Sequence, residues 1–149
     1  MIILLKNLTL IITIEIIPKI HKFWILNFGD LILKILIVDD SSTMRRILKN
    51  CLIKLGHETV LEACDGNEAK KVLDSNKDLN LAFIDWDMPN MNGLELLQAI
   101  QKDEKLKQIP VVIVATEAEK PNIIAAIKAG AINYVIKPFT SEIIAEKIR

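Results

Sequence analysis

From Ile35 onward, short unbroken apolar runs alternate along the chain with longer amphipathic segments. A run such as ILIV at 35–38 has no polar interruption, which is typical of a strand that is buried on both faces. On this basis we predict strands at 35–38, 59–63, 81–84, 111–114 and 134–136.

The segments between these runs show the period of a helix. Ser41 and Ser42 are suitable N-caps for the first helix, and Gly56 lies where a C-terminal cap is expected. The apolar residues of this helix recur at offsets of three and four and predict one buried face, made of Met44, Ile47, Leu48, Cys51, Leu52 and Leu55. Further helices are predicted up to about residue 74, after residue 93, and over 121–129 and 141–149.

Five strands that alternate with five helices predict an α/β fold. The expected architecture is an open, doubly wound sheet of five parallel strands, with helices on both faces. In such a fold the functional site lies in the crevice at the carboxyl ends of the strands.

Residues 1–34 differ from the rest of the chain in composition. They contain ten Ile and seven Leu but no Ala, Val, Arg or Ser. Charged residues such as Lys6, Glu15 and Lys19 interrupt the apolar stretches, so we expect no membrane span. We expect no secretory signal either, because the start is not basic and no cleavage site of small residues follows the apolar stretch. Three interpretations stay open: an additional structural element, a membrane-associating or targeting segment, or upstream sequence read from a misassigned start. We favour the third and assign the domain to 35–149.

Length and charge narrow the class of protein. A chain of 149 residues, 51% of them hydrophobic, suits one globular domain with a substantial core. The 19 basic residues balance the 19 acidic ones, which argues against a nucleic-acid binder that neutralises many phosphates. Cys51 and Cys64 lack the spacing of a zinc site or a disulfide framework, so we expect reduced thiols and a cytoplasmic protein.

Charged side chains follow three of the predicted strands. Asp39 and Asp40 end the first strand, Asp85 ends the third, and Lys137 ends the fifth. If they converge, three carboxylates and one ammonium group form a pocket of negative charge with oxygen ligands, which suits Mg²⁺. A hard cation beside an accessible aspartate indicates phosphoryl chemistry, with the aspartate as nucleophile.

Three motifs carry a resemblance to a known family. ILIVDDSSTMRR at 35–46, FIDWDMPNMNG at 83–93 and GAINYVIKPFT at 130–140 resemble the response-regulator receiver domain, above all its single-domain chemotaxis members. The resemblance covers 35–149 and implies the five-stranded, flavodoxin-like receiver fold. It implies a signalling protein of a two-component system rather than an enzyme, limited to phosphorylating itself from acyl phosphates and slowly losing that group.

The resemblance also implies a role for individual residues. A histidine kinase would phosphorylate Asp85, and Mg²⁺ would be held by Asp39, Asp40, Asp85 and the backbone carbonyl of Asp87. Lys137 would contact the phosphoryl group, the bond before Pro138 would be cis, and Tyr134 would be the aromatic switch.

One position departs from the family pattern. The residue that ends the fourth strand is usually Thr or Ser, whose hydroxyl contacts the phosphoryl group, but here it is Ala115 and the hydroxyl lies one place later, on Thr116. Successive side chains of a strand point to opposite faces, so the exchange is not neutral. We therefore expect either a remodelled loop in which Thr116 contacts the phosphoryl group, or phosphorylation that survives with weaker switching.

The expected partners follow from the same resemblance. They are a chemotaxis-type sensor histidine kinase, the flagellar motor switch protein and a phosphatase, with the chain acting as a monomer and binding no nucleic acid. The alternative is a phosphorelay intermediate or a receiver fragment of a larger regulator. A remote alternative is a Mg²⁺ phosphohydrolase of the haloacid-dehalogenase type, since Asp85 and Asp87 begin its motif, but Pro89 occupies the required Thr or Val position.

Overall fold

The computed structural model describes residues 32–148. Most of the atypical segment 1–34, with the interpretations that concern it, therefore lies outside the described residues. Within 32–148, no helix is both long and apolar enough to cross a membrane. The first strand begins at Lys34, one residue before the predicted start of the domain, and Leu33 is already buried.

Five parallel strands form one sheet in the order β2-β1-β3-β4-β5. Their bounds are β1 (Lys34–Val38), β2 (Thr59–Ala63), β3 (Leu81–Asp85), β4 (Val111–Thr116) and β5 (Asn133–Lys137). The strands lie close to the predicted ranges, and the parallel sheet confirms the predicted fold class. Because β1 pairs with β2 on one side and β3 on the other, the chain reverses its winding direction at β1.

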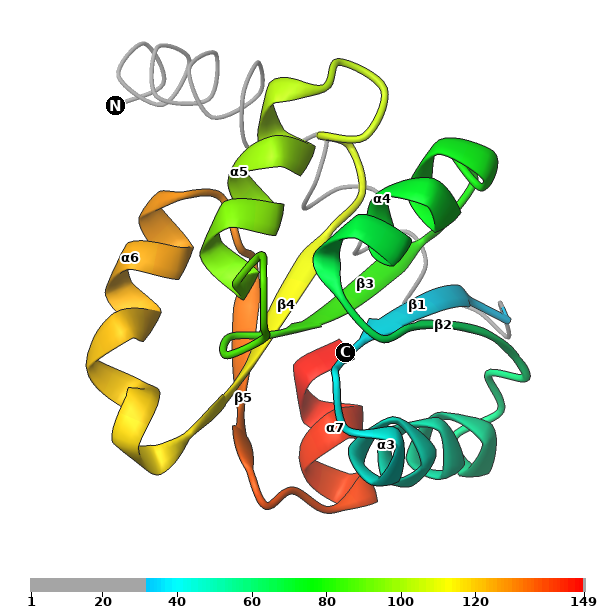
Figure 1. Cartoon of the computed structure of the whole chain (residues 1–149). Coiled ribbons are helices and arrows are strands. Elements are labelled where there is room, and N and C mark those ends of the chain that lie inside the picture. Colours follow the sequence, from blue (N-terminus) through cyan, green and yellow to red (C-terminus); the bar gives the residue numbers. More distant parts are fainter. Residues whose placement is uncertain (1–31, 149) are drawn as a thin grey trace, which may run out of the picture.

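Helices cover both faces of the sheet (Figure 1). One layer holds α3 (Ser42–Lys54) and α7 (Ser141–Ile148), and the other holds α4 (Gly66–Ser75), α5 (Gly93–Lys102) and α6 (Ile123–Lys128). Alternate residues of β1 pack against opposite layers of helices. Ile35 and Ile37 pack with α3 and α7, whereas Leu36 and Val38 pack with the other helices. The sheet is thus buried on both faces, which explains its unbroken apolar strands.

Side chains cap three of these helices at their first turn. Ser41, Asp65 and Asn92 accept hydrogen bonds from backbone N–H groups at the start of α3, α4 and α5. Each cap satisfies a donor that the helix itself leaves unpaired. These caps fix the residues that follow β1 and β3, where the charged side chains lie.

Two local expectations differ from the structure. The predicted helix 121–129 is instead a 3-10 helix, η1 (Glu117–Asn122), followed by α6. The Glu119 carboxylate accepts from the N–H and the hydroxyl of Thr116 across the first turn of η1, and Pro121, which has no N–H, fits in η1 before α6. Ile47, predicted on the buried face of α3, has 40% of its surface exposed because the contact with the sheet and α7 runs through Leu48, Cys51 and Leu52.

Candidate functional site

The register of the sheet brings the predicted acidic residues together. Val38 of β1 is paired with Ile84 of β3, so the residues that follow, Asp39 and Asp85, lie at the same edge. Both continue rows of side chains that face α3 and α7, as does Lys137 after Val135. These rows lie beside the point where the winding direction reverses, where open α/β sheets bind ligands.

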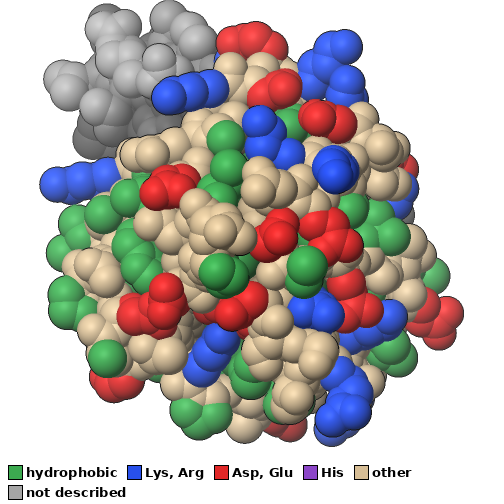
Figure 2. Space-filling model, in the orientation of Figure 1, with side chains coloured by type: hydrophobic (Ala, Val, Ile, Leu, Met, Phe, Trp, Pro, Cys, Tyr) green, Lys and Arg blue, Asp and Glu red, His purple; other side chains and the backbone are tan. Residues whose placement is uncertain are grey.

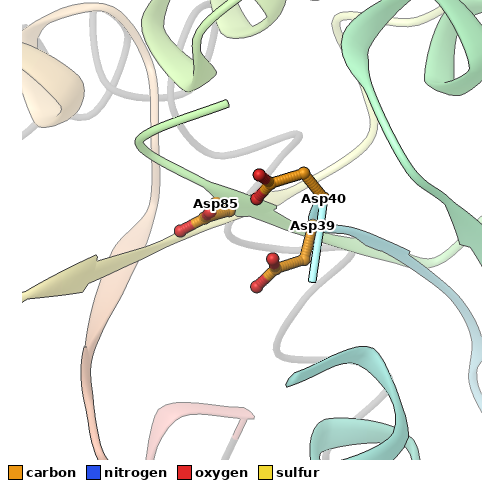
Figure 3. Close-up of side chains that lie close together, drawn as sticks. All are labelled: Asp39, Asp40 and Asp85. Carbon is orange, nitrogen blue, oxygen red and sulfur yellow. The ribbon is translucent and has the colours of Figure 1, made fainter. Parts of the chain in front are cut away.

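Three carboxylates form one cluster at this edge (Figure 3). A carboxylate oxygen from each of Asp39, Asp40 and Asp85 lies within 4.8 Å of the others. Asp39 and Asp85 are each only 5% exposed, whereas Asp40 is exposed. The cluster therefore has two buried members and one that faces solvent, which gives an incoming group a route to the site.

Lys137 bridges the two buried carboxylates. Its Nζ atom lies 3.0 Å from Asp39 Oδ2 and 3.0 Å from Asp85 Oδ1, with only 16% of the side chain exposed. Burial works to lower the pKa of this ammonium group, but its hydrogen bonds to the two carboxylates outweigh that effect and the pKa is raised. Lys137 is therefore a firmly protonated cation between two acids that would otherwise repel each other.

Burial and neighbouring charges both perturb the ionisation of Asp85. Burial, followed by the charge of Asp39, raises its pKa to about 6, and Lys137 offsets only part of that rise. The charge of Glu119 adds a smaller upward contribution. Three carboxylates share one ammonium group in this pocket, so an additional cation would stabilise the ionised form of Asp85.

The donor set fits a magnesium ion. It consists of hard carboxylate oxygens from two buried residues and one exposed residue, and these three acids outnumber the one lysine that bridges them. Mg²⁺ favours one or two carboxylates together with water and phosphate oxygens, whereas soft metals favour sulfur or imidazole ligands. Asp87 lies two residues beyond Asp85 on an exposed loop, and the role of its backbone carbonyl stays a prediction.

Gly93, which in the sequence marks only the start of a helix, lies against the backbone of Asp85. A Cβ atom at this position would lie 2.4 Å from the backbone oxygen of Asp85 and 2.9 Å from Cα of Trp86. The amide of Gly93 donates a hydrogen bond to the carbonyl of Trp86 at 2.8 Å. Only glycine permits this close approach of α5 to the Asp85 loop, and its place at the end of FIDWDMPNMNG was the one available signal.

The hydroxyl of Thr116, the last residue of β4, is already engaged. Thr116 donates from both its backbone N–H and its Oγ1 to Glu119 Oε1, each at 2.8 Å, while Ala115 is 1% exposed and has no hydroxyl to offer. The sheet register nevertheless places Thr116 opposite Lys137. The loop thus holds a hydroxyl near the site and directs it to Glu119, and a contact with a phosphoryl group stays a prediction.

Tyr134 and Pro138 lie on either side of Lys137. The side chain of Tyr134 is half-buried, and Nζ of Lys147 on α7 lies 4.2 Å from the centre of its ring. The Lys137–Pro138 peptide bond is cis.

Acidic and basic side chains are interspersed over the visible face of the molecule rather than gathered in one basic patch (Figure 2).

Comparisons with known proteins agree on one family. Residues 35–149 match the model of the response regulator receiver domain. The chain is 50% identical over 116 residues to chemotaxis protein CheY1 of Helicobacter pylori, a match that covers 78% of this chain and 94% of the relative. It is 49% identical to chemotaxis protein CheY of Pseudomonas aeruginosa, over 78% of this chain and 93% of that protein.

Solved structures give the same result. The crystallised chemotaxis protein CheY4 of Vibrio cholerae is 28% identical and superposes with a TM-score of 0.71, over 78% of this chain and 95% of that one. A response regulator receiver domain protein from Clostridium thermocellum is 31% identical, with a TM-score of 0.71, over 78% of this chain and 90% of that one.

Proposed function

Since the chain belongs to the response regulator receiver family and is homologous to chemotaxis regulators, we propose that Asp85 is its phosphoryl acceptor. The observation that carries this proposal is the buried pair of carboxylates bridged by Lys137, at the carboxyl edge of a parallel sheet. Asp85 is held beside both a second acid and a cation, an arrangement that a purely structural acid does not need.

The transfer follows from the groups present. A carboxylate oxygen of Asp85 forms a bond to phosphorus, and the bond from phosphorus to the donor breaks, with its electron pair leaving on the imidazole nitrogen or the acyl oxygen of the donor. The donor is a phosphohistidine of a sensor kinase or a small acyl phosphate. The Lys137 ammonium, already 3.0 Å from Asp85, pairs with the negative charge that arrives.

Magnesium would be held by Asp39, Asp40 and Asp85, with the backbone carbonyl of Asp87 as the proposed fourth ligand. When bound, it supplies positive charge that offsets the repulsion between the acids and the incoming phosphoryl oxygens. Asp39 keeps one carboxylate oxygen on Lys137, so this residue joins the metal site to the lysine.

The output of the domain is proposed to be a protein–protein contact. Phosphorylation would shift the half-buried Tyr134 and alter the adjoining surface of α6, β5 and α7. By homology to chemotaxis proteins, we propose a chemotaxis-type histidine kinase as donor and the flagellar motor switch protein as target, in the cytoplasm, with the chain as a monomer. Tighter binding of a motor-switch peptide after phosphorylation supports this target, and its absence favours a phosphorelay.

The acceptor is tested with the full chain, Mg²⁺ and acetyl phosphate, followed by intact-mass measurement. We expect one base-labile phosphoryl group, lost when Mg²⁺ is chelated and absent in Asp85→Asn. Asp87→Asn is the matched control, because it removes an exposed acid two residues away and leaves the backbone carbonyl in place. A phosphoryl group that persists in Asp85→Asn would contradict the assignment.

A further inference from the structure

Arg45 joins the acidic loop to the edge of the sheet. It lies on the first turn of α3, and its Nη1 atom donates a hydrogen bond of 2.7 Å to the backbone carbonyl of Asp39. Its Nε atom donates to Glu62 Oε1 on the edge strand β2 at 3.2 Å. The side chain is 17% exposed, so the guanidinium is largely withdrawn from water while it makes both contacts.

With Arg45 bound to its carbonyl, every polar group of Asp39 has a hydrogen-bond partner. Its N–H donates to the carbonyl of Ala63 at 3.1 Å, its Oδ1 accepts from the N–H of Ser41 at 2.8 Å, and its Oδ2 accepts from Lys137 at 3.0 Å. The carbonyl is the remaining polar group of Asp39, and Arg45 binds it. Because carbonyl and carboxylate share one Cα atom, holding the carbonyl restricts the direction in which the carboxylate points.

We propose that Arg45 is a positioning residue for the divalent-cation site, with Glu62 as its anchor on β2. The guanidinium holds the backbone at Asp39 so that the carboxylates of Asp39 and Asp40 stay together with that of Asp85. This inference rests on the proposed function, because it concerns the Mg²⁺ site of that reaction. Arginine suits the task since its rigid fork binds two acceptors at once.

The direction in which Mg²⁺ affinity changes when Arg45 is removed distinguishes a positioning role from a purely electrostatic one. Arg45 carries a positive charge close to the acidic cluster, so by Coulomb repulsion alone its removal would tighten the binding of a cation. If Arg45 instead holds the ligands in place, its removal weakens that binding. A charge effect shrinks as the ionic strength rises, whereas the loss of a positioned ligand persists.

Lys49 provides a matched control on the next turn of the same helix. Its Nζ atom pairs with Glu62 Oε2 at 3.2 Å, so it binds the same glutamate as Arg45 does. That ion pair is partly exposed, at 37% and 36% of the two side chains, and contributes little to stability. Lys49→Ala therefore removes a positive charge of similar placement without removing the contact with the Asp39 carbonyl.

The test is a Mg²⁺ titration of the full chain in a Trp24→Phe background, where Trp86, next to Asp85, is the only tryptophan. Trp86 fluorescence reports how much of the site is occupied by Mg²⁺, and calorimetry gives an independent value of the Mg²⁺ affinity. We expect Arg45→Ala to weaken Mg²⁺ binding about tenfold or more, at low and at high salt, as loss of a group that orients a metal ligand does. Lys49→Ala should stay within about twofold of the parent. Unchanged or tighter binding in Arg45→Ala would overturn the proposal.

Two further variants keep the test decisive if Arg45→Ala fails to fold, which urea unfolding would reveal. Arg45→Lys retains the charge but loses the fork, and Glu62→Gln removes the charge of the anchor. Both should bind Mg²⁺ more weakly than the parent, and parental affinity in both would refute the role of Arg45. A parent chain that neither binds Mg²⁺ nor gains a phosphoryl group on Asp85 would instead refute the proposed function.

Discussion

The two loops that border the acidic cluster are held in different ways. After β1, every polar group of Asp39 has a partner, and these partners come from β2, α3, β5 and the loop itself. At the end of β4, Ala115 offers no hydroxyl, and the hydroxyl of Thr116 is engaged by Glu119. The first loop holds its acid at every polar group, while the second has a hydroxyl that already donates to a neighbouring glutamate. We therefore propose that accepting a phosphoryl group and transmitting its effect to a partner are separable in this chain.

The largest expected effect comes from removing the cation of the acidic cluster. Lys137→Met leaves the two buried carboxylates without their shared partner, and we expect the free energy of unfolding to fall by roughly 3 kcal/mol when EDTA is present. Urea unfolding measures the loss. Adding Asp85→Asn to Lys137→Met should restore much of it, because one unpaired charge is then removed. A double variant that is less stable than Lys137→Met would show that the repulsion is unimportant.

Asp85→Asn should stabilise the chain in a pH-dependent way. The folded state raises the pKa of Asp85 from 3.8 to about 6, so it binds more protons than the unfolded state between these values. The free energy of unfolding of the wild type therefore falls as the pH rises through this window. The Asp85→Asn variant has no carboxyl group at this position and does not show that fall. In EDTA we expect the variant to gain about 2–3 kcal/mol over wild type at neutral pH and little near pH 4. A gain of equal size at both pH values would contradict the assignment of the shift to Asp85.

A smaller effect is expected on the side of β4. Ala115→Thr restores a hydroxyl at the usual position, and one hydrogen bond to a charged group contributes about 1.5–3 kcal/mol. We expect the phosphorylated variant to bind its partner peptide roughly tenfold more tightly than phosphorylated wild type. Thr116→Ala is the control, since its hydroxyl donates to Glu119. If Ala115→Thr changes neither partner affinity nor phosphoryl lifetime, the missing hydroxyl has no influence on signalling.

The smallest effect concerns the ring of Tyr134. Lys147 lies over this ring, and a partly exposed cation–π contact contributes about 0.5–1 kcal/mol. Lys147→Ala should therefore reduce the free energy of unfolding by no more than this, as measured in urea. Lys128→Ala, which truncates a lysine in the last turn of α6, is the comparison. A loss well above 1 kcal/mol would mean that Lys147 does more than cover the ring.

Much of the fold could be predicted from the sequence because the strands are buried on both faces and read as unbroken apolar runs. Parallel strands bring their carboxyl ends to one edge, so the convergence of Asp39, Asp85 and Lys137 followed from their positions after those runs. The register and the order of the strands then placed these residues within hydrogen-bonding distance.

Other features depended on contacts that no local pattern records. No pattern in the sequence singled out Arg45, because its contacts with Glu62 and the Asp39 carbonyl depend on how β2 lies beside α3. The exposure of Ile47 depends on how α3 sits on the sheet and α7, and η1 depends on the contact between Thr116 and Glu119. These are consequences of packing and of side-chain caps rather than of periodicity.

The proposed separation of Asp85 phosphorylation from the movement of Tyr134 can be measured directly, because Tyr134 is the only tyrosine in the chain. Ring-labelled tyrosine gives a single NMR environment, and the phosphoryl occupancy of the same sample is read by intact mass. We predict full occupancy on Asp85 with a Tyr134 signal only partly displaced, further displaced in Ala115→Thr and unmoved in Asp85→Asn. Complete displacement in phosphorylated wild type, with no change on adding Ala115→Thr, would contradict this account.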